Sequence, residues 1–335
     1  MKILYALQGT GNGHISRAKE IVPILQNYGE VDVLISGKEC SIDFEFNINY
    51  RYEGLNYAFG KKGGIDFWKT IKNFKLLRFF KEVKQFPIKN YDLVINDFEP
   101  VSAWAAKFSG TNIVSLSHQN AVYDEAAPKY GTFKIERLVL KYYAPAKIRF
   151  GFHFSAYSSS IFLPVIRQKI RSIRRSEKGH YTVYLPSYDH KKIQKILTKI
   201  PLVKWHIFSK DTDRIIFKKN VIVYPVNEFD FIKSMASCNG VLCGAGFETP
   251  AEALYLQKKL MVIPMKYQYE QQCNAIALKE LGVTVLKKLN KKNLDKIAFW
   301  ISSSDKVEVN YPDSTKDIIE SLVLPYHFDM VMATN

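Results

Sequence analysis

The sequence is poor in features that would place a protein across a membrane or in an oxidising compartment. It has 4 cysteines in 335 residues, with no Cys-x-x-Cys pair and no His/Cys spacing typical of a zinc site. No stretch approaches the roughly 18 to 20 apolar residues that span a bilayer. The short apolar start runs into a glycine-rich stretch, unlike a signal peptide. We therefore expect isolated buried thiols and a cytoplasmic location.

Acidic residues are also scarce, because 32 Asp and Glu face 48 Lys and Arg, giving a net charge of +16. Such a charge attracts nucleic acid, an acidic membrane surface or phosphorylated ligands. The chain shows no recognisable nucleic-acid-binding module, and its cations are spread along its length. We therefore expect no nucleic-acid partner and keep a basic nucleic-acid-binding protein without enzymatic activity as an alternative.

What the chain does contain is a repeated alternation of short apolar strands and helices. In the first half we predict strands at 2–8, 31–36, 49–52, 92–97, 111–118 and 149–157, with helices beginning near Ser16 and Pro100. After a basic segment that ends in glycine, further strands are predicted at 181–187, 203–209, 220–226, 240–246 and 259–265. This alternation favours parallel sheets with helices on both faces, in an α/β protein.

The pattern divides the chain into two similar α/β halves. We assign a Rossmann-like domain to residues 1–165, a linker to 166–180 and a second Rossmann-like domain to 181–312. Residues 313–335 are expected to form a C-terminal helix or tail that packs back on the first domain. Ligands should bind between the halves, outside the carboxyl ends of the strands.

Residues 67–84 are unusually rich in both aromatic and basic side chains. Their cations recur every three residues and so do not define one helical face, which predicts a kinked helix or two short ones. Such a composition suits an anionic membrane interface, at the inner face of the membrane for a cytoplasmic protein. A packed surface helix with snorkelling lysines fits equally well.

The loop LQGTGNGHISRA, residues 7–18, lies where a strand hands over to a helix. His14 replaces the third glycine of a dinucleotide fingerprint, and the Gly-Lys-Ser/Thr of a P-loop is absent. Gly11 and Gly13 would leave backbone N–H groups facing phosphate or developing negative charge. His14 suits proton transfer, although an incidental histidine in a glycine-rich turn is as plausible from sequence. Asp97 ends a strand and could act as the base, orient His14 or cap the next helix.

A second informative stretch covers residues 243–275. Gly244, Ala245 and Gly246 close a strand and open a helix, and Thr249 and Glu252 have the spacing of a capping box. The Glu252 carboxylate could instead accept both hydroxyls of a ribose. Polar groups follow one loop later, at Glu270, Gln271 and Asn274.

The motifs TPAEAL, IPM and YEQQCNA resemble the donor-binding signature of GT-B glycosyltransferases that use nucleotide-diphosphate sugars. The similarity extends to the UDP-glycosyltransferases and to the lipid II-forming N-acetylglucosaminyltransferase. GTGNGHISRA resembles the glycine-rich first loop of that transferase, and SHQNAV resembles its His-x-Gln-Asn segment. A group of glycosyltransferases shares GNGHxSRA and GAGFETPAEAL. The resemblance implies a GT-B fold, in which two Rossmann-like domains with parallel sheets face each other across a cleft.

The resemblance also implies roles for individual residues. Glu252 would hold the ribose, Glu270 and Gln271 would read sugar hydroxyls, and His14 would be the general base, with Asp97 as the second choice. The donor-side contacts would be Gly11, Gly13, Ser187, Gly244, Ala245, Gly246, Thr249 and Asn274. Two departures from the family stand out: Gly244 replaces a motif histidine, and LPSYDH replaces a loop usually rich in Gly and Ser.

The implied reaction is inverting transfer of a hexosyl-type sugar from a UDP-linked donor to a glycan or lipid-linked acceptor. We expect no metal and no cofactor, because helix N-termini and the positive field can stabilise the departing diphosphate without one. Asp211-Thr212-Asp213 sits in a polar loop and is best explained as a solvated turn. A non-hydrolysing nucleotide-sugar epimerase of the same fold is the alternative within enzymes.

Overall fold

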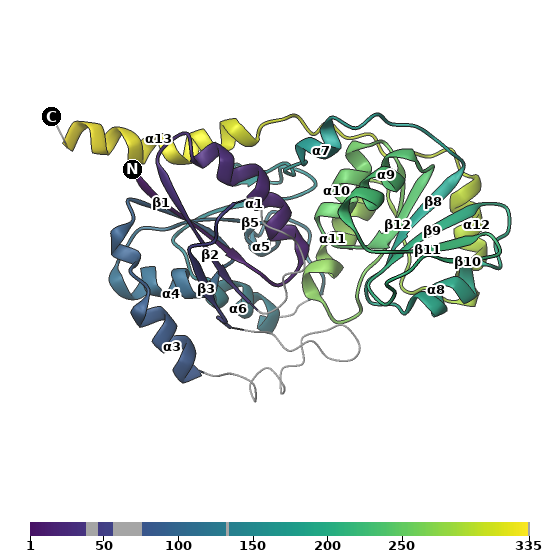
Figure 1. Cartoon of the computed structure of the whole chain (residues 1–335), viewed down its shortest axis with the longest axis horizontal. Coiled ribbons are helices and arrows are strands. Elements are labelled where there is room, and N and C mark those ends of the chain that lie inside the picture. Colours follow the sequence, from purple (N-terminus) through teal and green to yellow (C-terminus); the bar gives the residue numbers. More distant parts are fainter. Residues whose placement is uncertain (38–45, 56–75, 132–133, 334–335) are drawn as a thin grey trace.

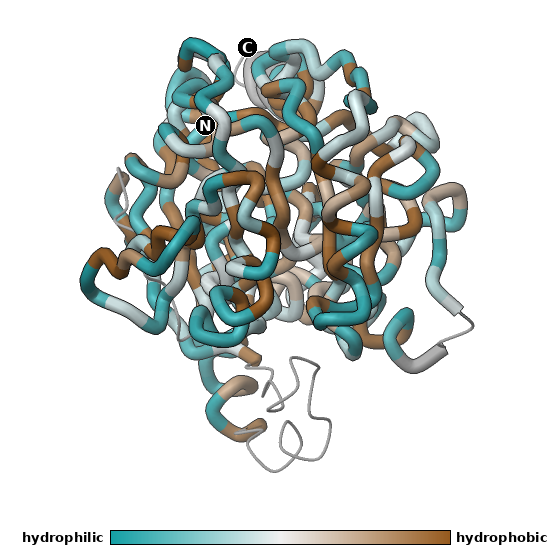
Figure 2. Tube along the Cα trace, turned by 90° about the vertical axis from the view of Figure 1, so that its right-hand side faces the viewer, coloured by the Kyte–Doolittle hydropathy of each residue, from teal (hydrophilic) through white to brown (hydrophobic). Residues whose placement is uncertain are grey.

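The computed structural model describes residues 1–37, 46–55, 76–131 and 134–333, and it contains two seven-stranded sheets (Figure 1). Each sheet is formed by a separate half of the chain. Apolar residues of the strands form the buried core of both halves. Figure 2 shows hydrophobic stretches among the inner segments and hydrophilic ones in many of the outer turns. The α/β class and the paired parallel sheets are therefore as predicted.

The first sheet has the strand order β3-β2-β1-β4-β5-β6-β7, and all its neighbouring strands are parallel. Its strands are β1 (Lys2–Gln8), β2 (Glu30–Ser36), β3 (Tyr50–Tyr52), β4 (Leu93–Asp97), β5 (Val114–Ser117), β6 (Ile148–Phe152) and β7 (Ile161–Phe162). β1 and β4 are buried along almost their whole length. This burial explains why they read as continuous apolar runs and not as alternating ones.

The helices of this half are α1 (Asn12–Leu25), α3 (Leu76–Gln85), α4 (Pro100–Ser109), α5 (His118–Tyr123) and α6 (Lys134–Tyr143), with a 3₁₀ turn η1 (Ile88–Asn90). The predicted start near Ser16 is wrong by one turn. Gly11, at a φ of 96° that favours glycine, turns the chain at once, and the helix begins at Asn12. His14 therefore lies in the first turn of α1 and not in the loop before it.

The second sheet has the order β10-β11-β9-β8-β12-β13-β14, with only the β10–β11 pair antiparallel. Its strands are β8 (His180–Tyr184), β9 (Lys204–Ser209), β10 (Ile216–Lys218), β11 (Val221–Pro225), β12 (Gly240–Gly244), β13 (Lys259–Ile263) and β14 (Thr284–Val285). Its helices are α8 (His190–Leu197), α9 (Glu228–Ser237), α10 (Glu248–Tyr255), α11 (Tyr269–Glu280) and α12 (Leu294–Ser302), with η2 (Lys291–Asn293).

The connection and the C-terminal segment tie the two halves together. A short helix, α7 (Gln168–Arg171), lies in the connecting segment. The final helix, α13 (Thr315–Ala333), returns to the first half and lies beside α1 (Figure 1), where the Tyr28 hydroxyl donates a hydrogen bond to Glu320.

The strand order places one topological switch point in each sheet. In the first sheet, β1 lies between β2 and β4, and pairing aligns Leu7 with Asp97. The loop after β1 and the end of β4 therefore open into the same crevice, where α/β sheets bind ligands. In the second sheet, β8 lies between β9 and β12, so the loop containing Ser187 and the turn at Gly244 to Gly246 meet in the same way.

Two further predictions concern thiols and membrane spans. Cys238, Cys243 and Cys273 are buried free thiols, as predicted, while Cys40 lies outside the described residues. Among the residues that the structure describes, no helix has the length and apolar character needed to cross a bilayer. Of the segment 67–84, residues 67–75 lie outside the described part, and the remainder falls in α3.

Candidate active site

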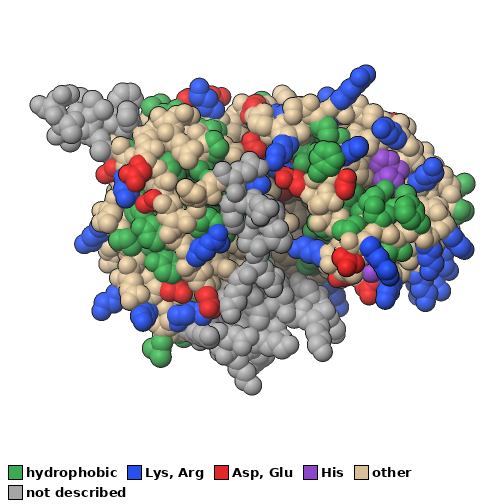
Figure 3. All heavy atoms as spheres, viewed as in Figure 1, with side chains coloured by type: hydrophobic (Ala, Val, Ile, Leu, Met, Phe, Trp, Pro, Cys, Tyr) green, Lys and Arg blue, Asp and Glu red, His purple; other side chains and the backbone are tan. Residues whose placement is uncertain are grey.

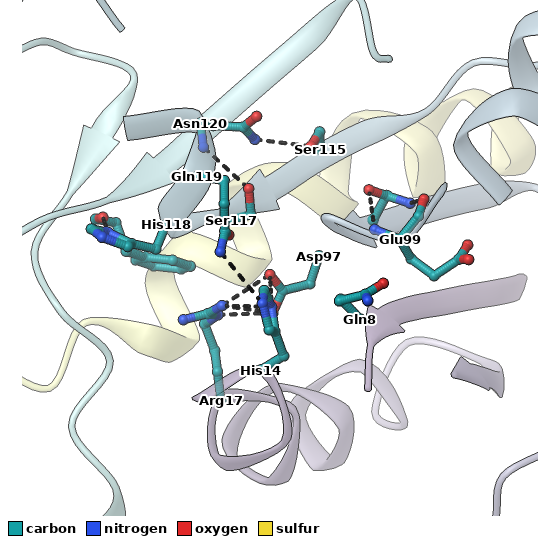
Figure 4. Close-up of polar contacts among 12 residues, drawn as sticks. Gln8, His14, Arg17, Asp97, Glu99, Ser115, Ser117, His118, Gln119 and Asn120 are labelled. Atoms are coloured by element: carbon teal, nitrogen blue, oxygen red, sulfur yellow. Dashed lines mark hydrogen bonds and ion pairs between the residues drawn. The ribbon is translucent and has the colours of Figure 1, made fainter. Parts of the chain in front are cut away.

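His14 and Asp97 meet at the switch point of the first sheet. His14 Nδ1 lies 2.9 Å from Asp97 Oδ1, and both side chains are buried (Figure 4). A carboxylate only accepts hydrogen bonds, so the short contact with Asp97 favours a ring proton on Nδ1, although Arg17 Nη2 also lies 3.3 Å from that nitrogen. In this tautomer Nε2 carries the lone pair that can take a proton, and its neighbour at 3.5 Å is the Gln119 amide nitrogen. This is the geometry of a general base held by an orienting carboxylate.

Asp97 therefore does not cap the next helix. That role belongs to Glu99, whose carboxylate accepts hydrogen bonds from the N–H groups of Val101 and Ser102 at 2.7 and 2.6 Å. Of the roles left open by sequence, capping by Asp97 is wrong, and the structure places Asp97 on His14. The chain after Asp97 turns at Phe98, which has a φ of 57°. Asp97 therefore contacts His14, while Glu99 caps α4.

Arg17 is a third member of this cluster that sequence reasoning missed. Its Nε and Nη2 atoms donate to Asp97 Oδ2 and Oδ1, each at 2.9 Å, in a bidentate pair (Figure 4). Burial would raise the pKa of Asp97, but the charges of Arg17 and His14 outweigh burial and hold that pKa below its usual value. A signal existed in the sequence, because Arg17 follows His14 by three residues and so shares its helical face.

His118 and Asn274 are both buried, and they contact each other across the two domains. His118 Nε2 lies 2.9 Å from Asn274 Oδ1, and Asn274 Nδ2 donates to the Ala245 carbonyl at 3.1 Å. The His118 ring also stacks on Phe247, with ring centroids 4.0 Å apart. The predicted donor residue Asn274 is therefore fully buried, where it fixes the turn after β12.

Gln119 connects the base to the second domain. Its Nε2 donates to Glu270 Oε2 at 3.1 Å and lies 3.5 Å from His14 Nε2. Its Oε1 is buried and has no hydrogen-bond partner among the residues that the structure describes. The Gln119 amide thus links Glu270 to His14 Nε2. Gln271 instead uses its Oε1 to accept a hydrogen bond from the Met265 N–H at 3.0 Å.

The turn after β12, at Gly244 to Gly246, has space beside its two glycines. Among the described residues, a methyl group at Gly246 would meet no atom within 4 Å, and one at Gly244 would meet only Gln271 Oε1, at 3.7 Å. Ala245 between them is buried. Ser187 lies exposed in the loop after β8, on the other side of the switch point.

Thr249 is the second residue of α10, whose N-cap is Phe247, so the predicted capping box is not formed. Glu252 instead accepts two hydrogen bonds from Arg167 of the connecting segment, at 2.6 and 2.8 Å. Arg167 also donates to Glu228 at 2.6 Å. The Glu252 side chain is only 3% exposed, and a ribose would have to share its carboxylate with Arg167.

A metal-ligating cluster is absent from the His14 and Asp97 site within the described residues. Among the described residues, the one group with suitable geometry lies in the second domain, after β8 and β9. It comprises Asp189, His190 and Asp211, whose ligand atoms lie within 4.8 Å of one another. Both of its carboxylates are exposed. Asp213, the second carboxylate of the Asp-Thr-Asp sequence, is not part of it.

Known structures share this architecture over the full chain. The crystal structure of Acinetobacter baumannii MurG is 15% identical, with a TM-score of 0.60 over 96% of this chain and 98% of its own. UGT2 of Phytolacca americana, complexed with UDP-2-fluoro-glucose and pterostilbene, is 12% identical, with a TM-score of 0.59 over 98% of this chain and 93% of its own. A UDP-N-acetylglucosamine 2-epimerase is 14% identical, with a TM-score of 0.57 over 98% and 97%.

At such low identities these likenesses establish the fold, which is GT-B, and leave the reaction to be argued from the site. No curated protein sequence matches the chain. The family model described as glycosyl transferase family 1 matches residues 1–303, which include both sheets and every residue of the candidate site. The chain therefore belongs to glycosyl transferase family 1.

Proposed function

We propose that the protein transfers a sugar from a nucleotide-diphosphate sugar, UDP-linked, to a hydroxyl of a glycan or lipid-linked acceptor, with inversion. The observation that carries this proposal is the buried His14–Asp97 pair at the switch point of one sheet, opposite the glycine turn of the other. Family membership supports the transfer of a glycosyl group.

In this reaction His14 Nε2 removes the proton of the acceptor hydroxyl while its oxygen attacks the anomeric carbon. The bond from that carbon to the diphosphate oxygen breaks, and the diphosphate leaves with the electron pair. Asp97 keeps the imidazole oriented and stabilises the imidazolium that forms, in the way a carboxylate supports a histidine base. The lowered pKa of Asp97 keeps this carboxylate charged at neutral pH.

The donor side lies on the second domain. We assign the diphosphate to the N–H groups and helix start around Gly244, Ala245, Gly246 and Thr249, with Ser187, Gly11 and Gly13 nearby. Glu270 and Gln271 would contact the sugar, and Asn274 would hold their turn in place. Glu252 would contact the ribose with the lone pairs that Arg167 leaves free. Backbone N–H groups and cations suffice to stabilise the leaving diphosphate, so the proposed chemistry uses no metal.

The first domain carries a surface suited to a lipid-linked acceptor. Leu76, Leu77 and Phe80 of α3 and Phe108 of α4 are exposed, and Phe80 and Phe108 lie with ring centroids 6.4 Å apart. Exposed lysines flank them at positions 81, 84 and 107. Figure 3 shows apolar and basic side chains side by side on this part of the molecule. An apolar patch with a basic rim supports docking to an anionic membrane surface.

A panel of nucleotide sugars incubated with glycan and lipid-linked acceptors tests the proposal. We expect release of UDP together with a new glycoside of inverted anomeric configuration, observed by NMR. Conversion of the donor to its sugar epimer without release of UDP would instead identify the epimerase alternative. A salt-dependent gel shift of short DNA, with no UDP binding, would identify the nucleic-acid-binding alternative.

A further inference from the structure

An ion pair between the two domains lies beside the His14–Asp97 pair. Arg17 of α1 donates from Nη1 to Glu248 Oε1 of α10, at 2.9 Å. The other two donor atoms of the guanidinium point back to Asp97. One arginine therefore contacts both the orienting carboxylate of the base and the first residue of the helix that follows the donor-side glycines.

The two partners of this ion pair differ in how exposed they are and in how many hydrogen bonds they make. The Arg17 side chain is 3% exposed and is fixed by two hydrogen bonds to Asp97, which is fully buried. The Glu248 side chain is 29% exposed, and among the contacts of the described residues it bonds to Arg17 alone. Burial would lower the pKa of Arg17, yet Asp97 and Glu248 raise it, so the cation is permanent. The anion is thus the movable member.

The Glu248 carboxylate also occupies space that a substrate anion would need. A methyl group placed on Gly13 would lie 2.4 Å from Glu248 Oε2, so this carboxylate packs directly against the first turn of α1. It stands two residues after Gly246, whose surroundings are open. None of the residues assigned to the donor turn at 244–246 and 249 carries a positive charge. Arg17 supplies a cation beside this turn, through its contact with Glu248.

We infer that Glu248 is a resident anion that the donor's diphosphate displaces from Arg17. Once displaced, it leaves Nη1 free to donate to a phosphate oxygen, and Arg17 then neutralises the charge that grows on the diphosphate as the sugar departs. Arg17 keeps its two bonds to Asp97 throughout, so the cation that receives the leaving group also holds the base assembly. This inference rests on the proposed function, and it adds a group from the first domain that contacts the diphosphate.

The test is titration calorimetry with UDP and, separately, with inorganic pyrophosphate, which lacks the nucleoside. E248Q keeps the shape but removes the competing charge, so we expect both ligands to bind the variant roughly tenfold more tightly. R17K should bind both ligands roughly tenfold more weakly and should bind uridine unchanged. E280Q is the matched control, because it makes the same charge change at the far end of α11 and should alter neither affinity.

The sign of the E248Q effect decides the inference even if R17K folds poorly. If E248Q leaves the affinities unchanged or weakens them while the wild type binds UDP, Glu248 only supports the structure, and the inference fails while the proposed donor stands. If the wild type binds pyrophosphate but not UDP, and E248Q tightens the former, the anion exchange stands and the nucleotide assignment fails. Binding of neither ligand by the wild type overturns both.

Discussion

The two glycine-rich turns that face each other differ in what they offer a substrate. The turn after β1 leads to two buried side chains, the His14 imidazole and the Arg17 cation, which converge on Asp97. The turn after β12 has open space at Gly246 among the described residues. In the proposed reaction the first domain supplies charge and proton transfer, and the second supplies room for the donor. The site is complete only where both turns meet.

The same contrast appears in two arginine–carboxylate pairs. Arg17 and Asp97 lie within the first domain and beside the base. Arg167 and Glu252 join the connecting segment to α10, and Arg167 has a second partner in Glu228. Both pairs are bidentate and buried, so each tolerates loss of its carboxylate poorly. In the proposed reaction the first pair supports the base, whereas the second holds the second domain to the connecting segment.

D97N should cause the largest loss of stability, about 3 to 5 kcal/mol, because it leaves the Arg17 guanidinium buried opposite a neutral amide. Urea denaturation at pH 7 measures this. Since the pKa of Asp97 is lowered on folding, its stabilisation is present above about pH 4 and is lost as the pH falls further. The stabilities of wild type and D97N should therefore converge in acid. A constant difference down to pH 3 would contradict this explanation.

E252Q should be milder, at roughly 1 to 3 kcal/mol, because the Arg167 side chain is 13% exposed, against 3% for Arg17, so water can partly replace the lost partner. Each arginine keeps a second carboxylate, Glu228 for Arg167 and Glu248 for Arg17. If Glu252 also holds the ribose, the variant should bind UDP roughly ten- to a hundredfold more weakly. Thermal melting and calorimetry on one preparation separate the two roles. A lower melting temperature with unchanged UDP affinity would leave Glu252 as a support for the linker alone.

Two alanine substitutions compare the turns directly. G246A meets no atom in the free protein, so it should melt like the wild type while its methyl group weakens UDP binding, roughly tenfold. G13A drives a methyl group into the Glu248 carboxylate and should cost about 1 kcal/mol of stability as that side chain shifts. Equal melting temperatures for the two variants would contradict the packing difference on which the comparison rests.

Part of this arrangement follows from sequence. Apolar runs predict β1, β4 and β12, and parallel order brings His14 and Asp97 to one edge. The start of α1 and the failed capping box at Thr249 depend on single backbone angles that composition does not fix. The Arg17–Glu248 and Arg167–Glu252 contacts join segments far apart in the chain. A long flexible arginine side chain can reach many carboxylates, so its partner cannot be predicted from the sequence and is known only from the folded structure.

The smallest effect should come from the surface of the first domain. L77N with K81Q and K84Q removes one side chain that is 90% exposed and two exposed lysines. Each cation near an anionic bilayer contributes about 1 kcal/mol, so sedimentation with anionic vesicles should show weaker binding. Arg78 is unsuitable for this test because it pairs with Glu53 and Glu82. Unchanged sedimentation, or none by the wild type, would leave α3 as an ordinary surface helix.

The central claim is that His14 is the base of a sugar transfer whose donor lies on the other domain. Single-turnover transfer by H14A, measured beside its UDP dissociation constant, tests this most directly. We expect the rate to fall roughly 10²-fold or more, as loss of a general base does, with UDP affinity changed by no more than about twofold. Transfer at the wild-type rate by a variant with weakened UDP binding would make His14 a phosphate ligand and contradict the account.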